Sequence, residues 1–175
     1  YYFVPFSSGA MEHATSISYP RAFATGSLTY ENTMAHELSH HWFGDLVTCE
    51  TEADMWINEG MASYSEHVFQ EYLNGKTAYK NAVRSNHEYV LHYAHINEGG
   101  YRAVSGIPHQ YTYGDHVYKK GADIAHTMRG YLGDSLFFVG LKSFLANNKY
   151  KHVNSTTFQN AMSSAKGKNM TDFFN

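Results

Sequence analysis

The sequence has few cysteines and prolines and no long apolar run, and each shortage excludes a class of protein. Its 175 residues include 1 Cys and 3 Pro. One cysteine excludes an internal disulfide framework and a cysteine-rich zinc finger. The low proline content, with 43% hydrophobic and 17% charged residues, excludes a disordered tail and a charge-driven scaffold. No stretch approaches the roughly 18 apolar residues of a membrane span, so we expect no membrane-spanning segment.

The chain also lacks an excess of charge of either sign. The 13 Lys and Arg against 16 Asp and Glu give a net charge of −3, which leaves no basic footprint for nucleic acid. We therefore expect no nucleic-acid partner. Histidine, by contrast, is abundant, at 12 residues. Because almost no cysteine is available, any metal site should use imidazole and carboxylate ligands.

The residue pattern predicts an α+β fold that is mostly helical. Short strand-like pieces fill residues 1 to about 26, where Ser, Gly and Pro interrupt them. Apolar spacing and stop signals predict helices over most of the remainder. These helices span about 29–43, 55–72, 77–96, 115–132, 134–147 and 155–166.

Single residues predict where several of these helices begin and end. Gly75 and Gly133 follow two of them and suit a helix stop, whereas Asp134 and Ser155 are the expected N-caps of the last two. Among the aromatic residues, Trp42, Phe43 and Trp56 are expected in the core, because large apolar side chains are mostly buried.

We expect residues 1–175 to form a single, partial domain cut from a larger protein. The chain starts at Tyr1 with an apolar stretch that lacks a basic region and a small-residue cleavage site, so we do not expect this stretch to be a signal peptide. It ends shortly after the apolar pair Phe173–Phe174, without a helix stop signal. Flanking domains are therefore expected to be absent from this chain.

The motif that carries chemistry lies at residues 36–40, which read His-Glu-Leu-Ser-His. On a helix, His36 and His40 lie about 40° apart around the axis and about 6 Å apart along it. Two imidazoles at that spacing reach one metal ion, and Glu37 beside the first is placed to hold a water molecule. Composition alone produces this pattern in some shuffled chains. Glu59, 19 positions after His40, strengthens the interpretation, because two His and one Glu form a catalytic zinc set with a fourth position open.

Four motifs in order give the chain a specific resemblance. Residues 36–45 (His-Glu-Leu-Ser-His-His-Trp-Phe-Gly-Asp) and 56–62 (Trp-Ile-Asn-Glu-Gly-Met-Ala) match a zinc signature, and residues 9–13 (Gly-Ala-Met-Glu-His) and 118–122 (Tyr-Lys-Lys-Gly-Ala) flank it. In this order and spacing the chain resembles the gluzincin aminopeptidases of the aminopeptidase N and leukotriene-hydrolase family. The resemblance implies the catalytic domain of a zinc metallopeptidase with thermolysin-like architecture.

The resemblance implies a mechanism built on one Zn²⁺ per chain, bound by His36, His40 and Glu59. Zinc in such a set polarises a peptide carbonyl and lowers the pKa of its water towards about 7. Glu37 is the expected general base. Tyr118 is the expected phenol donor to the oxyanion. Tyr111 and Tyr113 lie nearby in the sequence, and only the motif selects Tyr118.

The first motif implies recognition of peptides with a free N-terminus. Glu12 supplies a negative charge for the terminal ammonium. Gly9, Ala10 and Met11, read as an extended edge, are expected to bind the substrate backbone as an added strand. His13 stands where the family carries Asn. An imidazole can acquire a charge and an amide cannot, so contacts at the substrate end should differ here.

Three other functions remain open on these residues. An endopeptidase or an epoxide hydrolase could use the same zinc site, and a non-catalytic module could bind zinc or a peptide. The Gly-Ala-Met-Glu motif favours an aminopeptidase, and a purely structural site would not need Glu37. We expect export to the periplasm or secretion. The sequence leaves the oligomeric state and the preferred N-terminal side chain open.

Overall fold

The computed structural model describes residues 4–6, 9–167 and 169–174. Helices dominate it, as the sequence predicts. The elements in chain order are β1 (Val4–Phe6), β2 (Ser18–Pro20), the 3₁₀ helix η1 (Arg21–Phe23), α1 (Glu31–Ser39), β3 (Thr48–Cys49), the 3₁₀ helix η2 (Glu52–Ile57), α2 (Glu59–Tyr89), the π-helix η3 (Val90–Ala94), α3 (His95–Asn97), the 3₁₀ helix η4 (His109–Tyr111), the π-helix η5 (His116–Lys120), α4 (Gly121–Leu132), α5 (Asp134–Asn147), β4 (His152–Val153), α6 (Ser155–Lys166) and α7 (Thr171–Phe174).

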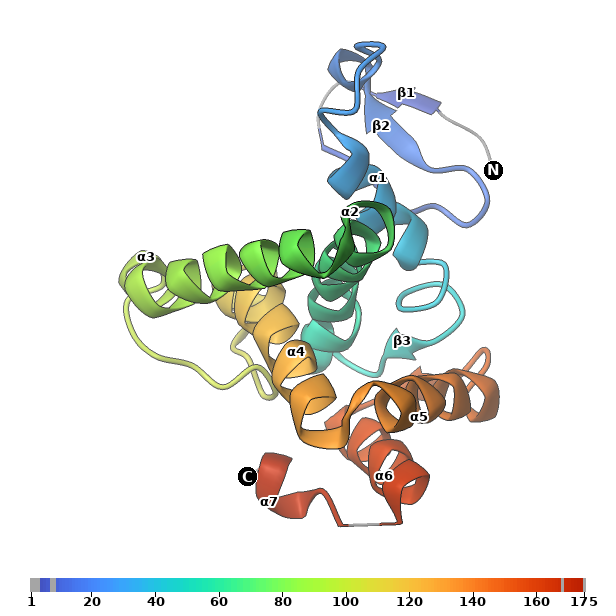
Figure 1. Ribbon diagram of the computed structural model, residues 1–175, viewed down its shortest axis with the longest axis vertical. Coiled ribbons are helices and arrows are strands. Elements are labelled where there is room, and N and C mark those ends of the chain that lie inside the picture. The colour runs from blue at the N-terminus through green and yellow to red at the C-terminus, as the bar shows by residue number, and fades with distance from the viewer. Residues whose placement is uncertain (1–3, 7–8, 168, 175) are drawn as a thin grey trace.

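The described strands form two small parallel pairs. β1 pairs with β2 in the register Val4 to Ser18, and β3 pairs with β4 in the register Thr48 to His152. Figure 1 shows β1 and β2 at one end of the molecule and the C-terminal helices α5, α6 and α7 at the other. The expected strand break at residues 7–8 lies outside the described residues.

Helix α2 organises the molecule, because α1, α4 and η5 all pack against it. It is interrupted at Gly75, where the backbone has φ 81° and ψ 179°. This positive φ is accessible to glycine at no steric cost, and it turns the second half of α2 away from the first (Figure 1). The helix stop predicted at Gly75 is therefore confirmed as a break inside one long element.

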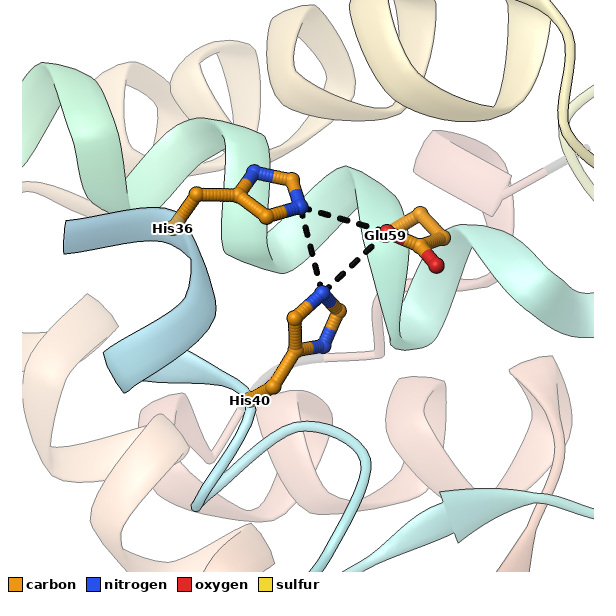
Figure 2. Close-up of side chains that lie close together, drawn as sticks. All are labelled: His36, His40 and Glu59. Atoms are coloured by element: carbon orange, nitrogen blue, oxygen red, sulfur yellow. Dashed lines mark hydrogen bonds and ion pairs between the residues drawn. The ribbon is translucent and has the colours of Figure 1, made fainter. Parts of the chain in front are cut away.

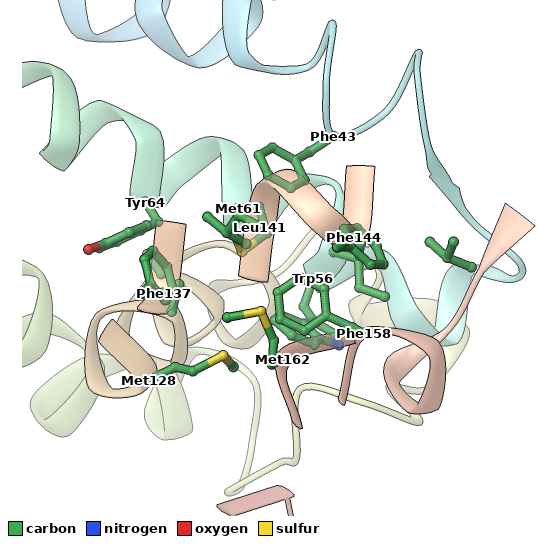
Figure 3. Close-up of a cluster of buried hydrophobic side chains, with 14 of the residues drawn as sticks. Phe43, Trp56, Met61, Tyr64, Met128, Phe137, Leu141, Phe144, Phe158 and Met162 are labelled. Carbon is green, nitrogen blue, oxygen red and sulfur yellow. The ribbon is translucent and has the colours of Figure 1, made fainter. Parts of the chain in front are cut away.

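The hydrophobic core lies where α2, α4, α5 and α6 meet (Figure 3). Trp56 is 1% exposed; its ring meets Phe158 at 5.3 Å between centroids, and its Nε1 donates to the Ser155 hydroxyl at 2.8 Å. The burial predicted for Phe43 and Trp56 is confirmed. The burial predicted for Trp42 is wrong, because its side chain is 47% exposed.

Trp42 lines an apolar groove instead of the core. This groove of about 950 Å³ runs between α1 and the first half of α2 and includes Met34, Leu38 and Phe69. Nothing in the described part of the chain fills it. Met34 and Leu38, four positions apart on α1, both line this groove, so this apolar face of α1 is only partly covered.

The last two long helices begin and end where the sequence predicts, but their N-cap residues differ from the predicted ones. α5 and α6 match the predicted ranges, and Gly133, at φ 79°, precedes α5. The N-cap of α6 is Asn154, whose side chain accepts from the Thr157 N–H. Ser155 was expected there, but its hydroxyl bonds to Trp56 and Asp54 instead. Asp134 is the first residue of α5 and binds Arg129.

Candidate active site

Two histidines of the candidate site come from the end of α1. His36 lies in its last turn, and His40 follows Ser39 with helical dihedrals of φ −61° and ψ −21°. One turn of helix separates them, so both rings leave the same face. Both side chains are buried, His36 at 8% and His40 at 1% exposure.

The third member, Glu59, is the first residue of α2. The preceding residue, Asn58, ties this helix start to β3: its Oδ1 accepts from the Cys49 N–H at 3.0 Å, and its Nδ2 donates to the Thr48 hydroxyl at 3.1 Å. The Glu59 side chain is thereby held in front of the two imidazoles, and it is 7% exposed.

The three side chains converge on one point, as Figure 2 shows. Nε2 of His36 and Nε2 of His40 are 3.1 Å apart, and Oε2 of Glu59 lies 3.3 Å and 3.2 Å from them. Tetrahedral zinc with nitrogen ligands at 2.0–2.1 Å separates its ligand atoms by about 3.3 Å. The three donor atoms therefore have the spacing of a zinc site.

The partners of the outer ring nitrogens leave the inner ring nitrogens available as candidate metal ligands. Nδ1 of His36 lies 2.9 Å from Oε1 of Glu66, and Nδ1 of His40 lies 2.8 Å from the Phe43 carbonyl. A carboxylate and a carbonyl only accept, so each Nδ1 carries the hydrogen and each Nε2 presents a lone pair. Three acceptor atoms thus face one another, and this arrangement requires a positive charge between them.

Without a metal ion, protons on the imidazoles supply this positive charge. Burial lowers the pKa of His36, but its hydrogen bonds to Glu59 and Glu66 outweigh burial and raise that pKa to about 9. Burial raises the pKa of Glu59, but the two histidines outweigh it and hold the pKa at about 2. A carboxylate and two imidazoles arranged in this way fit a divalent cation.

Sequence reasoning missed the two groups that orient the imidazoles. Glu66 lies seven residues after Glu59, two turns further along α2 on a similar face, and that spacing could have revealed it. The Phe43 carbonyl is a backbone group and left no signal in the sequence.

Two further carboxylates reach the site. Oxygens of Glu12 and Glu37 and a ring nitrogen of His40 all lie within 4.8 Å of one another. Glu37 is 6% exposed, and burial raises its pKa to about 7 against the opposing effect of the two histidines. The structure thus places the expected base and the expected ammonium-binding residue beside the same ligand.

The comparison with protein families decides what this site belongs to. Residues 3–175 match the model described as "Peptidase family M1 domain". The chain belongs to peptidase family M1. Its curated M1 relatives include aminopeptidase N of Lactococcus lactis, 31% identical over 96% of this chain and 21% of the relative. A probable aminopeptidase 2 of Sulfurisphaera tokodaii is 28% identical over 95% of this chain and 23% of the relative.

Solved M1 structures share the fold. An M1 zinc metallopeptidase variant from Deinococcus radiodurans, bound to a Tyr-Ser-Ala substrate, superposes with a TM-score of 0.83 at 23% identity, covering 98% of this chain and 37% of that one. Aminopeptidase A of Legionella pneumophila, in complex with aspartic acid, gives a TM-score of 0.74 at 23% identity, over 98% of this chain and 20% of that one. The chain thus spans about a fifth of the length of the curated M1 relatives named here.

Tyr118 lies at the candidate active site, on the π-helix η5. Its ring stacks on that of His36, with centroids 6.0 Å apart and planes 6° apart. Burial, and then the neighbouring carboxylate of Glu59, raise the pKa of its phenol. Of the two alternatives, Tyr111 lies under the Arg102 guanidinium and Tyr113 is 71% exposed. The structure therefore brings Tyr118 to the ligands, as the motif predicts.

Of the three residues expected to offer an unpaired backbone edge to the substrate, one is already paired. Met11 exchanges both of its backbone hydrogen bonds with Ser18, at 3.0 Å and 2.9 Å. Its main chain is therefore already paired, which leaves Gly9 and Ala10 as the stretch that could pair with a substrate. His13 bonds to the Ser18 hydroxyl through Nδ1 at 3.2 Å.

The loop after Glu12 is tied to the metal-site helix. The Thr15 N–H donates to Nε2 of His41 at 3.1 Å, and Nδ1 of His41 donates to the Leu38 carbonyl. Thr15 has φ 64°, a conformation that costs a non-glycine residue roughly 1–2 kcal/mol. His41, the neighbour of the candidate ligand His40, therefore contacts the loop that follows Glu12.

Among the described helices, none is both long and apolar enough to cross a membrane.

Proposed function

We propose that this chain carries the active site of a zinc-dependent aminopeptidase, which removes the N-terminal residue from peptides. One observation carries the proposal: ligand atoms of His36, His40 and Glu59 converge within 3.3 Å, with Glu12 and Glu37 beside them. The aminopeptidase names of the M1 relatives support the substrate class. We further propose that residues 1–175 form one catalytic domain of thermolysin-like architecture.

The residues of the ligand set would hold zinc through two neutral imidazoles and one carboxylate. When bound, Zn²⁺ supplies Lewis acidity that polarises a peptide carbonyl and acidifies a water molecule. Glu66 and the Phe43 carbonyl keep the imidazoles in the required tautomer, because each fixes a hydrogen on Nδ1.

Glu37 would be the general base of the reaction. Its carboxylate takes a proton from the attacking water and later delivers it to the leaving amine, as a positioned carboxylate near the reacting bond can do. Tyr118 would donate its phenol hydrogen to the oxyanion that develops on the former carbonyl. Its stacking on His36 keeps the hydroxyl beside Glu59 and hence beside the reacting centre.

Glu12 would select peptides with a free N-terminus. Its carboxylate, 4.0 Å from Nδ1 of His40, can form a charge-assisted hydrogen bond with a terminal ammonium. An internal peptide segment would leave that carboxylate without a cation. Backbone groups of Gly9 and Ala10 would hold the substrate main chain in extended form.

The test uses the full-length protein that contains this chain. Glu37→Gln should retain zinc, measured by elemental analysis, and lose peptide turnover by about 10²–10⁴-fold, the usual contribution of general base catalysis. Unchanged turnover would contradict the mechanism. N-acetylated peptides are the second arm, and equal cleavage of blocked and free peptides would contradict the role of Glu12 and favour an endopeptidase.

A further inference from the structure

A hollow with several charged and polar residues in its lining lies away from the candidate active site, between the second half of α2 and α4. It has a volume of about 380 Å³, and its lining includes Tyr79, Lys80, Arg84, His87, Asp123 and His126. None of these residues belongs to the candidate ligand set or to the residues around it. Lys80 and Arg84 are one helical turn apart, so both cations lie on the same face of α2.

A chain of hydrogen bonds runs from the interior to this hollow. Nη1 of Arg129 lies 3.4 Å from the Tyr64 hydroxyl, which lies 2.9 Å from the Tyr79 hydroxyl. The Tyr79 hydroxyl lies in turn 2.7 Å from Nδ1 of His126. Arg129 and both tyrosines are buried, so each hydroxyl hydrogen needs a partner inside the chain.

The number of hydrogens available determines which group donates in each of these hydrogen bonds. Arg129 only donates, so Tyr64 accepts from it and has one hydrogen to give. Within the described residues, the acceptor within reach of that hydrogen is the Tyr79 oxygen. Tyr79 must then donate its own hydrogen to Nδ1 of His126.

His126, which lines the hollow, therefore carries its ring hydrogen on Nε2. Because Nδ1 accepts from Tyr79, the ring hydrogen of the neutral imidazole sits on Nε2. Burial lowers the pKa of His126, in agreement with a neutral ring. An Nε2 that carries hydrogen cannot ligate a metal, which distinguishes this hollow from a metal site.

The one carboxylate of the hollow is already engaged. Oδ1 of Asp123 accepts from Nδ2 of Asn86 at 2.8 Å, and Oδ2 lies 3.0 Å from Nδ1 of His87. The lining thus holds two cationic side chains and the His126 imidazole against a single carboxylate, and both oxygens of that carboxylate are hydrogen-bonded. Such a set of donors suits a negatively charged oxygen ligand.

We propose that this hollow binds a small oxyanion through Lys80, Arg84 and the Nε2–H of His126. Phosphate and carboxylate share this chemistry. This site is separate from the residues proposed for peptide hydrolysis. A negative binding result would therefore leave the proposed aminopeptidase function unaffected.

The test is calorimetric titration of the zinc-loaded, full-length protein with inorganic phosphate at constant ionic strength, and separately with acetate. Saturable binding with one site per chain is expected, and whichever anion binds more tightly identifies the tetrahedral or the planar ligand. Lys80→Ala or Arg84→Ala should weaken binding about tenfold or more, the size of one charge-assisted hydrogen bond. Lys149→Ala, which removes the same charge from an exposed residue that does not line the hollow, should leave it unchanged.

Tyr79→Phe tests the hydrogen-bond chain without changing any charge. It frees the His126 tautomer and should weaken phosphate binding several-fold while the protein stays folded by circular dichroism. If Tyr79→Phe does not fold, Lys80→Ala and Arg84→Ala, which change exposed residues, still test whether the hollow binds the anion. The proposal is overturned if neither anion binds saturably, or if Lys149→Ala weakens binding as much as Lys80→Ala. It is also overturned if phosphate binding is unchanged in Lys80→Ala and Arg84→Ala, as expected for phosphate bound at the zinc site.

Discussion

Gly60 and Gly121 touch through their backbones. A Cβ atom on Gly60 would lie 2.9 Å from the Gly121 Cα, and one on Gly121 would lie 2.8 Å from the Gly60 Cα. Side chains essentially never come so close to backbone, so both positions require glycine. Gly60 directly follows Glu59, and Gly121 lies three residues after Tyr118. This contact therefore sets how closely the phenol approaches the third ligand.

Gly121→Ala should destabilise the protein by about 1–3 kcal/mol, the usual cost of an added methyl in a packed interior. It should also lower kcat more than it changes KM, because the two helix starts must separate and carry Tyr118 away from Glu59. Thermal unfolding and steady-state kinetics measure the two effects.

Gly130→Ala is the matched control for this substitution. Gly130 lies in α4, and a Cβ there would meet nothing within 4 Å. Alanine should stabilise the helix by about 0.5–1 kcal/mol with kcat unchanged. Equal behaviour of the two variants would contradict the importance of the glycine contact.

The sequence predicted much of this arrangement because its strongest signals are local. The helices at 134–147 and 155–166 begin and end as expected, since Gly133 and Gly167 stop helices through positive φ. The spacing of His36 and His40 predicted their convergence, because one helix carries both.

Features that depend on tertiary packing left no such signal. The π-helix η5 shifts hydrogen bonds by one residue, which apolar periodicity does not encode. Asn154 caps α6 in place of Ser155, because the Ser155 hydroxyl bonds to Trp56, 99 positions earlier in the chain, and to Asp54. Glu66 and the Phe43 carbonyl likewise became visible only once α1 and α2 were packed together.

Glu98 and His116 form a buried pair at the start of η5. Nδ1 of His116 donates to Oε2 of Glu98 at 2.6 Å, and the His116 backbone N–H donates to the other oxygen at 3.2 Å. Glu98→Ala should leave both donors without a partner and destabilise the protein by about 1–3 kcal/mol. Since Tyr118 lies in the same turn, kcat should fall as well.

The exposed His92, six residues before Glu98 in the chain, gives a comparison for this effect. His92→Ala should change neither stability by more than about 0.5 kcal/mol nor kcat. A Glu98→Ala variant that loses stability but keeps its full kcat would show that the pair does not position Tyr118.

His67 should make stability depend on pH. Burial lowers its pKa; Lys119 and His126 act in the same direction, and Glu66 and Asp123 oppose them. Its Nε2 is buried without a partner among the described groups. The unfolded chain therefore binds a proton below about pH 6.5 that the folded chain rejects. Stability should fall as the pH drops below that value and should not change from this residue above it.

His67→Gln should flatten the dependence of the urea midpoint between about pH 6.5 and 5, the range below the ordinary histidine pKa. His92→Gln, whose residue is exposed, should leave the slope as it is. The same slope in the His67→Gln variant would assign the acid sensitivity to other groups.

Zinc should stabilise the folded protein through the three converging atoms. A ligand that binds only the folded state at 100 times its Kd contributes about 2.7 kcal/mol. Adding zinc after chelation should therefore raise Tm, and His36→Ala should abolish the rise. His41→Ala, one residue past a ligand but bonded to the Thr15 loop, should retain it. A rise that survives His36→Ala would place the metal elsewhere.

The order in which the chain supplies its site has a practical consequence. The three candidate ligands lie within residues 36–59, whereas Tyr118 arrives only when α4 and η5 pack on α2. Closing a short loop costs less entropy than closing a long one. During partial unfolding, Tyr118 should therefore leave the site before the three candidate ligands separate. Zinc content will therefore overcount competent enzyme in an aged or partly unfolded preparation, and only active-site titration gives a true specific activity.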